Sequence, residues 1–233
     1  MKKIVFIPTH NEKNNISLLI YKILNLRLNF DILIIDDNSK DGTRNILDKI
    51  KKKKGIKTIY RAQKLGIGSA HKTALKWCYK NKYSIIISMD GDGTHDPKYI
   101  PKLLKKSKNY DFVSTTRFKK KNSLKGWPIW RIALTSLRHI ILVKALKLEF
   151  DASGAFRLIN SNKVKLSHFI SAKNNSYSFF WESLFILKRE KYSITEIPIS
   201  LNARKSGSSK MSLFDICRAL KYLIIFLFKK NKF

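Results

Sequence analysis

The first half of the chain alternates short apolar runs with longer segments that have helical periodicity. Most of the runs are rich in Ile, Leu and Val, which is the pattern of strands buried on both faces of a sheet. They predict strands at residues 4–7, 32–35, 57–60, 85–89 and 112–115. Helices are predicted at about residues 12–25, 43–50, from 65 onward and 97–107. This alternation predicts parallel strands joined by right-handed crossovers, as in a Rossmann-like half.

The pattern changes after Arg117. A break at Trp127-Pro128 precedes a long apolar helix predicted over residues 131–148. The remaining predicted elements are a helix over 179–188, a strand over 192–199, a polar loop over 204–209 and a last helix over 211–228. Because no internal repeat or low-complexity linker separates them, we expect one domain over residues 1–210. An amphipathic helical element over residues 211–233 follows, and its composition suits a membrane interface.

Composition narrows the classes of partner. The chain of 233 residues carries a formal charge of +32, with lysines scattered along its length. No basic repeat with interleaved aromatic residues and no zinc-finger pattern is present, so we expect an anionic partner plus a composition bias rather than nucleic acid. Cys78 and Cys217 are predicted to be buried free thiols in a reducing cytosol. The apolar run before Pro8 is too short for a signal peptide, and no uncharged run reaches the roughly 18 residues of a spanning helix.

The strongest candidate for chemistry follows the strand at residues 85–89. Asp90-Gly91-Asp92 comes directly after this strand, and the glycine lets two carboxylates converge at its carboxyl end. Carboxylate oxygens suit a hard cation such as Mg²⁺ or Mn²⁺ that also holds phosphates. Asp96-Pro97 then predicts a helix start, which puts the motif on a strand–loop–helix corner. Taken alone, this motif fits a metal site and a solvated acidic turn about equally well.

Four segments in a fixed order decide between these interpretations. They are Pro8-Thr9-His10-Asn11-Glu12, Ile35-Asp36-Asp37-Asn38-Ser39-x-Asp41-Gly42-Thr43, Met89-Asp90-Gly91-Asp92 and Arg204-x-x-Gly207-x-Ser209-Lys210. With them the chain resembles the family 2 inverting glycosyltransferases, and most closely the dolichol-phosphate (polyprenyl-phosphate) mannosyltransferases. Asp151-x-x-Gly154-x-Phe156-Arg157 and Glu196-Ile197-Pro198-Ile199 also match that branch. The resemblance implies an α/β fold of the GT-A type, a mostly parallel central sheet flanked by helices, with C-terminal amphipathic helices.

The resemblance also implies roles for individual residues. Nucleotide base and ribose would be held by Pro8, His10, Glu12, Ile35 and Asp37. Diphosphate and a Mg²⁺ or Mn²⁺ ion would be held by Asp90, Gly91 and Asp92, with Thr94 as a further metal ligand. Phosphate groups of donor and acceptor would be bound by Arg117, Arg131, Arg204 and Lys210, so Asp92 and these four cations are the expected catalytic residues. His10 stands where the family has tyrosine, and Thr94 where it has glutamine or serine.

The acceptor decides whether a general base is needed. A phosphate monoester has a second pKa of about 6 and is already an anion at neutral pH, so it needs cations more than a base. We expect residues 1–118 to bind the nucleotide sugar, with GDP-mannose as the expected donor, and residues 119–210 to bind a polyprenyl phosphate. The close alternative is a UDP-sugar donor or a saccharide acceptor, for which Glu182 and Asp151 are the obvious candidate bases.

A membrane surface is the expected location of the reaction. Trp127, Trp130 and the apolar helix that follows, together with the last helix, have the lysine-flanked composition of interfacial helices. We therefore expect a cytoplasmic enzyme bound peripherally to the membrane, or one that relies on a separate membrane partner. From another class, the chain could be a non-catalytic basic module that binds membranes or nucleic acid, and intact Asp90 and Asp92 argue against it.

Overall fold

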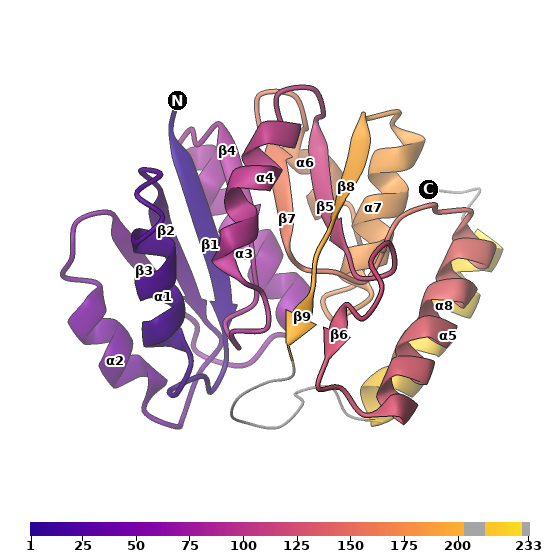
Figure 1. The fold of residues 1–233 in the computed structure, drawn as a ribbon, viewed down its shortest axis with the longest axis horizontal. Helices are drawn as coiled ribbons and strands as arrows, with labels where there is room; N and C mark the ends of the chain where they lie inside the picture. Colours follow the sequence, from indigo (N-terminus) through magenta and orange to yellow (C-terminus); the bar gives the residue numbers. More distant parts are fainter. Residues whose placement is uncertain (203–212, 230–233) are drawn as a thin grey trace.

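Seven strands form one sheet in the computed structural model, which describes residues 1–202 and 213–229 (Figure 1). They are β1 (Lys3–Thr9), β2 (Asp31–Asp36), β3 (Ile56–Tyr60), β4 (Ile85–Ser88), β5 (Phe112–Thr116), β7 (Arg157–Asn160) and β8 (Ile194–Pro198). Their order is β3-β2-β1-β4-β7-β5-β8, and all are parallel except β7, which pairs antiparallel with β4 and β5. A separate short parallel pair joins β6 (Leu124–Lys125) to β9 (Leu201–Asn202).

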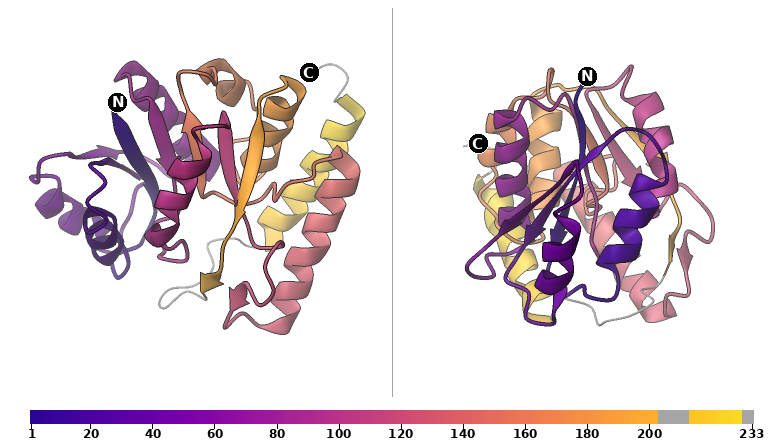
Figure 2. Two further views of the ribbon diagram at one scale, coloured as in Figure 1. Left: turned by 45° about the horizontal axis from the view of Figure 1, so that its top comes forward. Right: turned by 90° about the vertical axis from the view of Figure 1, so that its left-hand side faces the viewer.

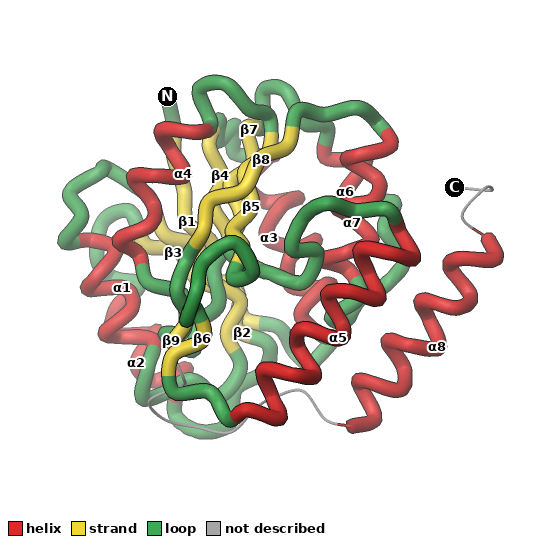
Figure 3. The backbone as a smooth tube through the Cα atoms, turned by 45° about the vertical axis from the view of Figure 1, so that its right-hand side comes forward, coloured by secondary structure: helices red, strands yellow, loops and turns green. Residues whose placement is uncertain are grey.

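Helices cover both faces of this sheet. They are α1 (Ile16–Leu24), α2 (Thr43–Ile50), α3 (Ile67–Lys80), the 3₁₀ turn η1 (Pro97–Tyr99), α4 (Ile100–Lys106), α5 (Ile129–Leu146), α6 (Leu166–Ile170), α7 (Phe179–Arg189) and α8 (Leu213–Lys229). One face carries α1, α2 and α4, and the other carries α3, α6 and α7 (Figures 1 and 2). Helices α5 and α8 both lie at the end of the molecule nearest β8, and the right-hand view of Figure 2 shows them on opposite sides of it (Figures 2 and 3).

Two apolar clusters, one on each side of the sheet, form the core. In β1, Ile4 and Phe6 belong to the cluster under α3 and α7, whereas Val5 and Ile7 belong to the cluster under α1 and α4. This alternation follows from the period of two along a strand, and residues 4–7 of β1 are all apolar because both faces of the strand are buried. The sheet therefore holds the carboxyl ends of β1, β2 and β4 in fixed register at one edge.

The alternating strands and helices predicted for the first half are confirmed, and two predictions differ from the structure. Helix α1 begins at Ile16 rather than near residue 12, because the backbone N–H groups of Asn15 and Ile16 both donate to the carbonyl of Glu12 in a turn. Cys78 is a buried free thiol as predicted, whereas Cys217 is exposed on α8, whose other side packs on the core. The sequence did not predict β7, whose four residues include the buried Arg157.

Candidate active site

A pocket of about 600 Å³ lies where β1, β2 and β4 end. These strands are parallel neighbours, so the loops that follow them open at the same edge of the sheet. The pocket is lined by Pro8, Thr9, His10, Glu12, Asp37, Lys64, Leu65, Gly66, Ile67, Ala70, Asp90, Gly91, Asp92, Asn174, Asn175, Ser176, Tyr177, Asp215 and Arg218. It therefore brings together most of the nucleotide-binding and metal-binding residues expected from the sequence.

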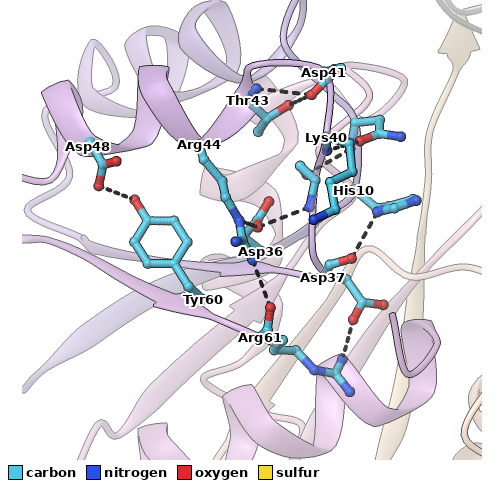
Figure 4. A network of polar contacts seen from close by, with 12 residues as sticks. His10, Asp36, Asp37, Lys40, Asp41, Thr43, Arg44, Asp48, Tyr60 and Arg61 are labelled. Atoms are coloured by element: carbon cyan, nitrogen blue, oxygen red, sulfur yellow. Dashed lines mark hydrogen bonds and ion pairs between the residues drawn. The ribbon is translucent and has the colours of Figure 1, made fainter. Parts of the chain in front are cut away.

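Asp36 ends β2, Asp37 follows it, and the two have different partners (Figure 4). The Arg44 side chain donates to Asp36 Oδ2 at 2.7 Å, and neither of these residues lines the pocket. Asp37 pairs with the buried guanidinium of Arg61 at 3.1 Å and accepts hydrogen bonds from the backbone N–H groups of Leu65 and Gly66. Asp37 thus fixes the loop at residues 64–66, which forms one wall of the pocket.

His10 and Glu12 reach the pocket from the loop after β1. His10 Nδ1 lies 2.9 Å from the carbonyl oxygen of Asp37, so Nδ1 carries the proton and donates to that carbonyl (Figure 4). Glu12 is buried, its backbone N–H donates to Thr43 Oγ1, and its carboxylate accepts from Asn15 Nδ2 at 2.7 Å. The loop after β1 and the loop after β2 are therefore joined by hydrogen bonds before any ligand binds. Such preorganisation lowers the cost of binding.

The Asp90-Gly91-Asp92 loop continues β4 into the pocket. A Cβ on Gly91 would lie 3.0 Å from Thr9 Oγ1 and 3.2 Å from the Pro8 carbonyl, so a side chain here would push this loop away from β1. Asp92 is buried, and its Oδ1 accepts hydrogen bonds from the backbone N–H and the hydroxyl of Thr94. The structure thus places Thr94 as a partner that orients Asp92.

His95 supports the same loop from beneath. The backbone N–H of Asp90 donates to His95 Nδ1 at 3.0 Å, so this nitrogen is an acceptor and bears no proton. Burial lowers the pKa of His95 to about 4, which keeps the ring neutral at physiological pH. The approach of Nδ1 to Asp90 Oδ2 at 3.7 Å is therefore no ion pair. The His95 side chain thus supports the loop by accepting a hydrogen bond from the backbone of Asp90.

The pair Asp90 and Asp92 fits a hard divalent cation. Mg²⁺ is usually bound by one or two carboxylates together with phosphate oxygens of a substrate, rather than by an all-protein cage. The Asp90 side chain is 30% exposed, and both aspartates line the pocket. No cluster of three or more His, Cys, Asp and Glu residues suited to a metal occurs in residues 1–202 and 213–229. A cation here would thus draw its remaining ligands from a phosphorylated ligand and water.

Arg117 lies at a second cavity, of about 460 Å³, between β5, β6 and α5. Its Nε donates to Asp151 Oδ2 at 2.9 Å, and the Asp151 side chain is 1% exposed. Burial raises the pKa of Asp151, but Arg117 and the hydrogen bonds from Ser153 outweigh it and hold the pKa below its usual value. Asp151 is therefore an ionised partner of Arg117 rather than an available base.

Glu182, the other candidate base, is also fully engaged. Its side chain is buried on α7 and accepts from the backbone N–H groups of Lys173 and Asn174 at 2.7 and 2.9 Å. The Tyr222 hydroxyl donates to the same carboxylate at 3.0 Å. With both oxygens occupied and no exposed surface, Glu182 has the environment of a structural anchor.

Two further expected residues do not line the pocket. Arg131 lies in the first turn of α5, with its guanidinium stacked 4.3 Å from the Trp127 ring. The Ile35 side chain is fully buried in the core cluster under α3, so it faces away from any ligand. Arg204 and Lys210, by contrast, lie outside the described residues.

Sequence reasoning missed two walls of the pocket. One is residues 174–177, before α7, and the other is Asp215 and Arg218 of α8. A signal for the first wall was present in Gly66-x-Gly68, at the start of the helix predicted from residue 65 onward. A Cβ on Gly68 would lie 2.8 Å from the carbonyl carbon of Asn175, so this glycine marks where α3 meets the missed wall.

Replacing Gly68 with alanine is expected to lower the free energy of unfolding by about 1–3 kcal/mol, the usual cost of overpacking. Alanine is favoured over glycine within a helix, but here its methyl group would meet Phe179 Cβ at 2.7 Å and the backbone of Asn175. Urea denaturation would measure the loss, with Lys76→Ala, exposed on the same helix, as the control. If the free energy of unfolding of Gly68→Ala stayed within about 0.5 kcal/mol of wild type, residues 174–177 would be able to shift and accommodate the methyl group without loss of stability.

Exposed apolar side chains gather on the two edge helices. On α5 they are Ile129, Trp130, Leu134, Leu137 and Ile140, and on α8 they are Phe214, Leu220, Ile224, Ile225 and Phe228. Apolar groups exposed in this number on two helices at one end of the molecule mark an interaction surface rather than ordinary surface variation. Neither these helices nor any other in the described part of the chain has the length and hydropathy to cross a membrane.

Comparison with known proteins identifies a glycosyltransferase family and relatives named as a mannosyltransferase and a monophosphomannose synthase. The family model described as glycosyl transferase family 2 matches residues 4–185. The undecaprenyl-phosphate mannosyltransferase of Micrococcus luteus is 26% identical over 215 residues, which covers 91% of this chain and 88% of that protein. The polyprenol monophosphomannose synthase of Mycolicibacterium smegmatis is 25% identical over 223 residues, covering 94% of this chain and 84% of that protein.

Solved structures share the fold. Glucosyl-3-phosphoglycerate synthase from Mycobacterium tuberculosis, in complex with Mn²⁺, UDP and glucosyl-3-phosphoglycerate, matches with a TM-score of 0.68 at 17% identity. The match covers 97% of this chain and 78% of that one. The same synthase with Mg²⁺ and UDP gives a TM-score of 0.63. This likeness confirms the predicted fold class, a mostly parallel sheet flanked by helices of the GT-A type.

Proposed function

Because the chain belongs to glycosyl transferase family 2, and is therefore a glycosyltransferase, we propose that it transfers a hexose from a nucleotide sugar to a polyprenyl phosphate. Mannose from GDP-mannose is the proposed donor sugar, in keeping with the names of the two relatives that match most of the chain. The observation that carries the proposal is the pocket at the ends of β1, β2 and β4, where Asp90 and Asp92 meet the His10, Glu12 and Asp37 loops.

We assign the donor to this pocket. Base and ribose bind between the β1 and β2 loops, against Pro8, His10, Glu12 and Asp37, and Ile35 contributes through its backbone because its side chain is buried. Asp90 and Asp92, with Gly91 between them, face the diphosphate end, and Thr94 holds Asp92 in place. Mg²⁺ or Mn²⁺ held by these carboxylates supplies charge neutralisation of the leaving diphosphate.

The acceptor phosphate is assigned to the side of Arg117. This arginine lines the second cavity together with Lys125 and Ser136, and Arg131 lies in the first turn of the helix that forms its wall. Arg204 and Lys210 are proposed to contribute further cations. An ionised phosphate oxygen attacks the anomeric carbon as the bond to the nucleoside diphosphate breaks, so the configuration inverts and no proton has to be removed.

The state of the two candidate bases favours a phosphate acceptor over a sugar hydroxyl. A hydroxyl nucleophile needs a carboxylate that can accept its proton, within hydrogen-bond reach. Asp151 is bound by Arg117 and Ser153, and Glu182 is bound by two backbone N–H groups and Tyr222. A phosphate acceptor avoids the need for either of them.

We further propose that residues 1–210 form the transferase domain, whose two halves divide near residue 118, and that residues 211–233 form a membrane-interface element. The exposed apolar side chains of α5 and α8 support this assignment, because a polyprenyl chain lies within the bilayer. Peripheral attachment to a lipid surface, directly or with a separate membrane partner, would let the soluble donor and the lipid acceptor meet at one protein.

Release of GDP from GDP-mannose with Mn²⁺ is the test. It is expected to depend on a short polyprenyl phosphate and to stay at background with the matching polyprenol, which lacks the phosphate. Turnover with the polyprenol would instead indicate a hydroxyl acceptor, and turnover of UDP-sugars alone would change the donor. Turnover of no nucleotide sugar would refute the proposed function.

A further inference from the structure

One wall of the donor pocket comes from the last helix of the described chain. Asp215 and Arg218, one turn apart on α8, line the same pocket as Asp90 and Asp92. The exposed apolar residues Ile224, Ile225 and Phe228 lie farther along this helix. Helix α8 therefore contributes both to the pocket and to the surface that we assign to the membrane interface.

The position of α8 is fixed by packing against α7. Leu223 and Phe226 are buried, and the Phe226 ring meets the rings of Trp181 and Phe185 edge-on at 5.0 and 5.2 Å. Buried aromatic pairs of this geometry stabilise beyond their buried area. Arg218, two turns before Phe226, is thus held at the pocket by the core of the protein.

A hydrogen bond ties α8 to the neighbouring wall of the pocket. The Tyr222 hydroxyl donates to Glu182 Oε1 at 3.0 Å, and burial raises the pKa of Tyr222, so it remains a phenol. The same carboxylate accepts from the backbone N–H groups of Lys173 and Asn174, where the wall at residues 174–177 begins. Glu182 therefore fixes α8 and this wall relative to each other.

Arg218 is one of two cationic side chains that line the pocket among the described residues. The other is Lys64, and the carboxylates of Glu12, Asp37, Asp90, Asp92 and Asp215 line the same pocket. The Arg218 guanidinium stacks 4.6 Å from the Phe214 ring and forms no ion pair with a carboxylate of residues 1–202 and 213–229. Its planar fork matches the oxygens of a phosphate group.

We propose that Arg218 binds the diphosphate of the nucleotide-sugar donor, and that Tyr222 and Glu182 are positioning residues for it. The inference rests on the proposed function, because it takes the pocket as the donor site. Under this proposal, α8 belongs both to the donor site, through Arg218, and to the surface that we assign to the membrane interface. The same helix therefore contacts the donor and the lipid that carries the acceptor.

Binding of GDP and of guanosine separates a phosphate contact from a general loss of structure. With Mn²⁺ present, Arg218→Gln is expected to weaken inhibition by GDP about tenfold and to leave inhibition by guanosine unchanged, since guanosine has no phosphate. Inhibition of Arg218→Lys by GDP is expected to be intermediate between wild type and Arg218→Gln, because lysine keeps the positive charge and loses the planar fork of the guanidinium. Arg189→Gln, an exposed arginine at the end of α7, is the matched control.

Kinetics provide the second arm. Arg218→Gln is expected to raise the KM for GDP-mannose about tenfold and leave the KM for the lipid acceptor unchanged. Tyr222→Phe, which keeps the ring and loses the hydroxyl, is expected to raise the donor KM two- to fivefold without changing kcat.

Unchanged GDP inhibition in Arg218→Gln, or equal losses for GDP and guanosine, would overturn the role of Arg218. If wild type turned over UDP-sugars only, UDP and uridine would replace GDP and guanosine in the same comparison. If wild type binds neither GDP nor UDP, both the inference and the proposed function are overturned. If wild type turns over its donor and Arg218→Gln behaves as wild type does, the inference alone is overturned.

Discussion

Alanine at position 92 is expected to lower kcat for sugar transfer about 10²–10³-fold, the cost of removing one preorganised group that stabilises developing charge. Asp92 is buried beside Gly91 and oriented by two hydrogen bonds from Thr94, so its carboxylate is fixed before the donor binds. Turnover at saturating donor and saturating Mn²⁺ measures the effect. Addition of EDTA to wild type is expected to produce a similar loss, and excess Mn²⁺ to reverse it.

Asp96→Ala is the matched control for this experiment. Asp96 lies four residues along the same loop and accepts from the backbone N–H of Lys98 at 3.0 Å as the N-cap of η1. Its loss is expected to cost about 1 kcal/mol of stability and to leave kcat unchanged. If Asp92→Ala had the kcat of wild type, Asp92 would have no role in catalysis.

Replacing Arg117 with alanine is expected to lower the free energy of unfolding by about 3–5 kcal/mol at pH 7, because it leaves a buried carboxylate without its counterion. The Asp151 side chain is 1% exposed and would keep its hydrogen bonds from Ser153 and from the backbone N–H of residue 117. Urea denaturation measures the loss. Adding Asp151→Asn to the variant is expected to restore part of the stability, because the amide carries no charge.

The stability deficit of this variant should shrink as pH falls. In wild type the pKa of Asp151 is lowered on folding, so its contribution is present above about pH 4 and lost as pH falls through the folded pKa. Without Arg117, the folded pKa of Asp151 is higher than in wild type, because burial still raises it and the Arg117 charge no longer lowers it. The folded variant then takes up its proton at a higher pH than wild type does, so the difference in stability between them decreases as pH falls. A deficit that does not change with pH would show that Arg117 acts through packing alone.

The local elements were predictable because their signals are local. Apolar runs gave β1, β2 and β4, and the carboxylates at their ends, Asp37 and Asp90, were found because parallel strands end at the same edge. Helix α5 was predicted over residues 131–148 and begins two residues earlier, after Pro128. These features depend on periodicity and on turn residues, which a single sequence displays.

Features that depend on distant partners were not predictable. The four residues of β7 have no periodicity long enough to identify a strand, and its direction is set by the two strands that flank it. Glu182 was a candidate base because a sequence shows a residue type but not how many hydrogen bonds it receives. Arg218 was missed because the packing of Phe226 on α7, far along the chain, brings it to the pocket.

The insertion of β7 has a consequence for the order of folding. Strands β1 to β4 pair among themselves, so they can form a sheet as soon as residue 88 has been synthesised. By contrast, β5 pairs with β7 and β8, both of which come later in the chain. A nascent chain that ends before Arg157 therefore carries an open edge at β4 and an unpaired β5, both prone to wrong pairing. Both are closed together when β7 enters between them.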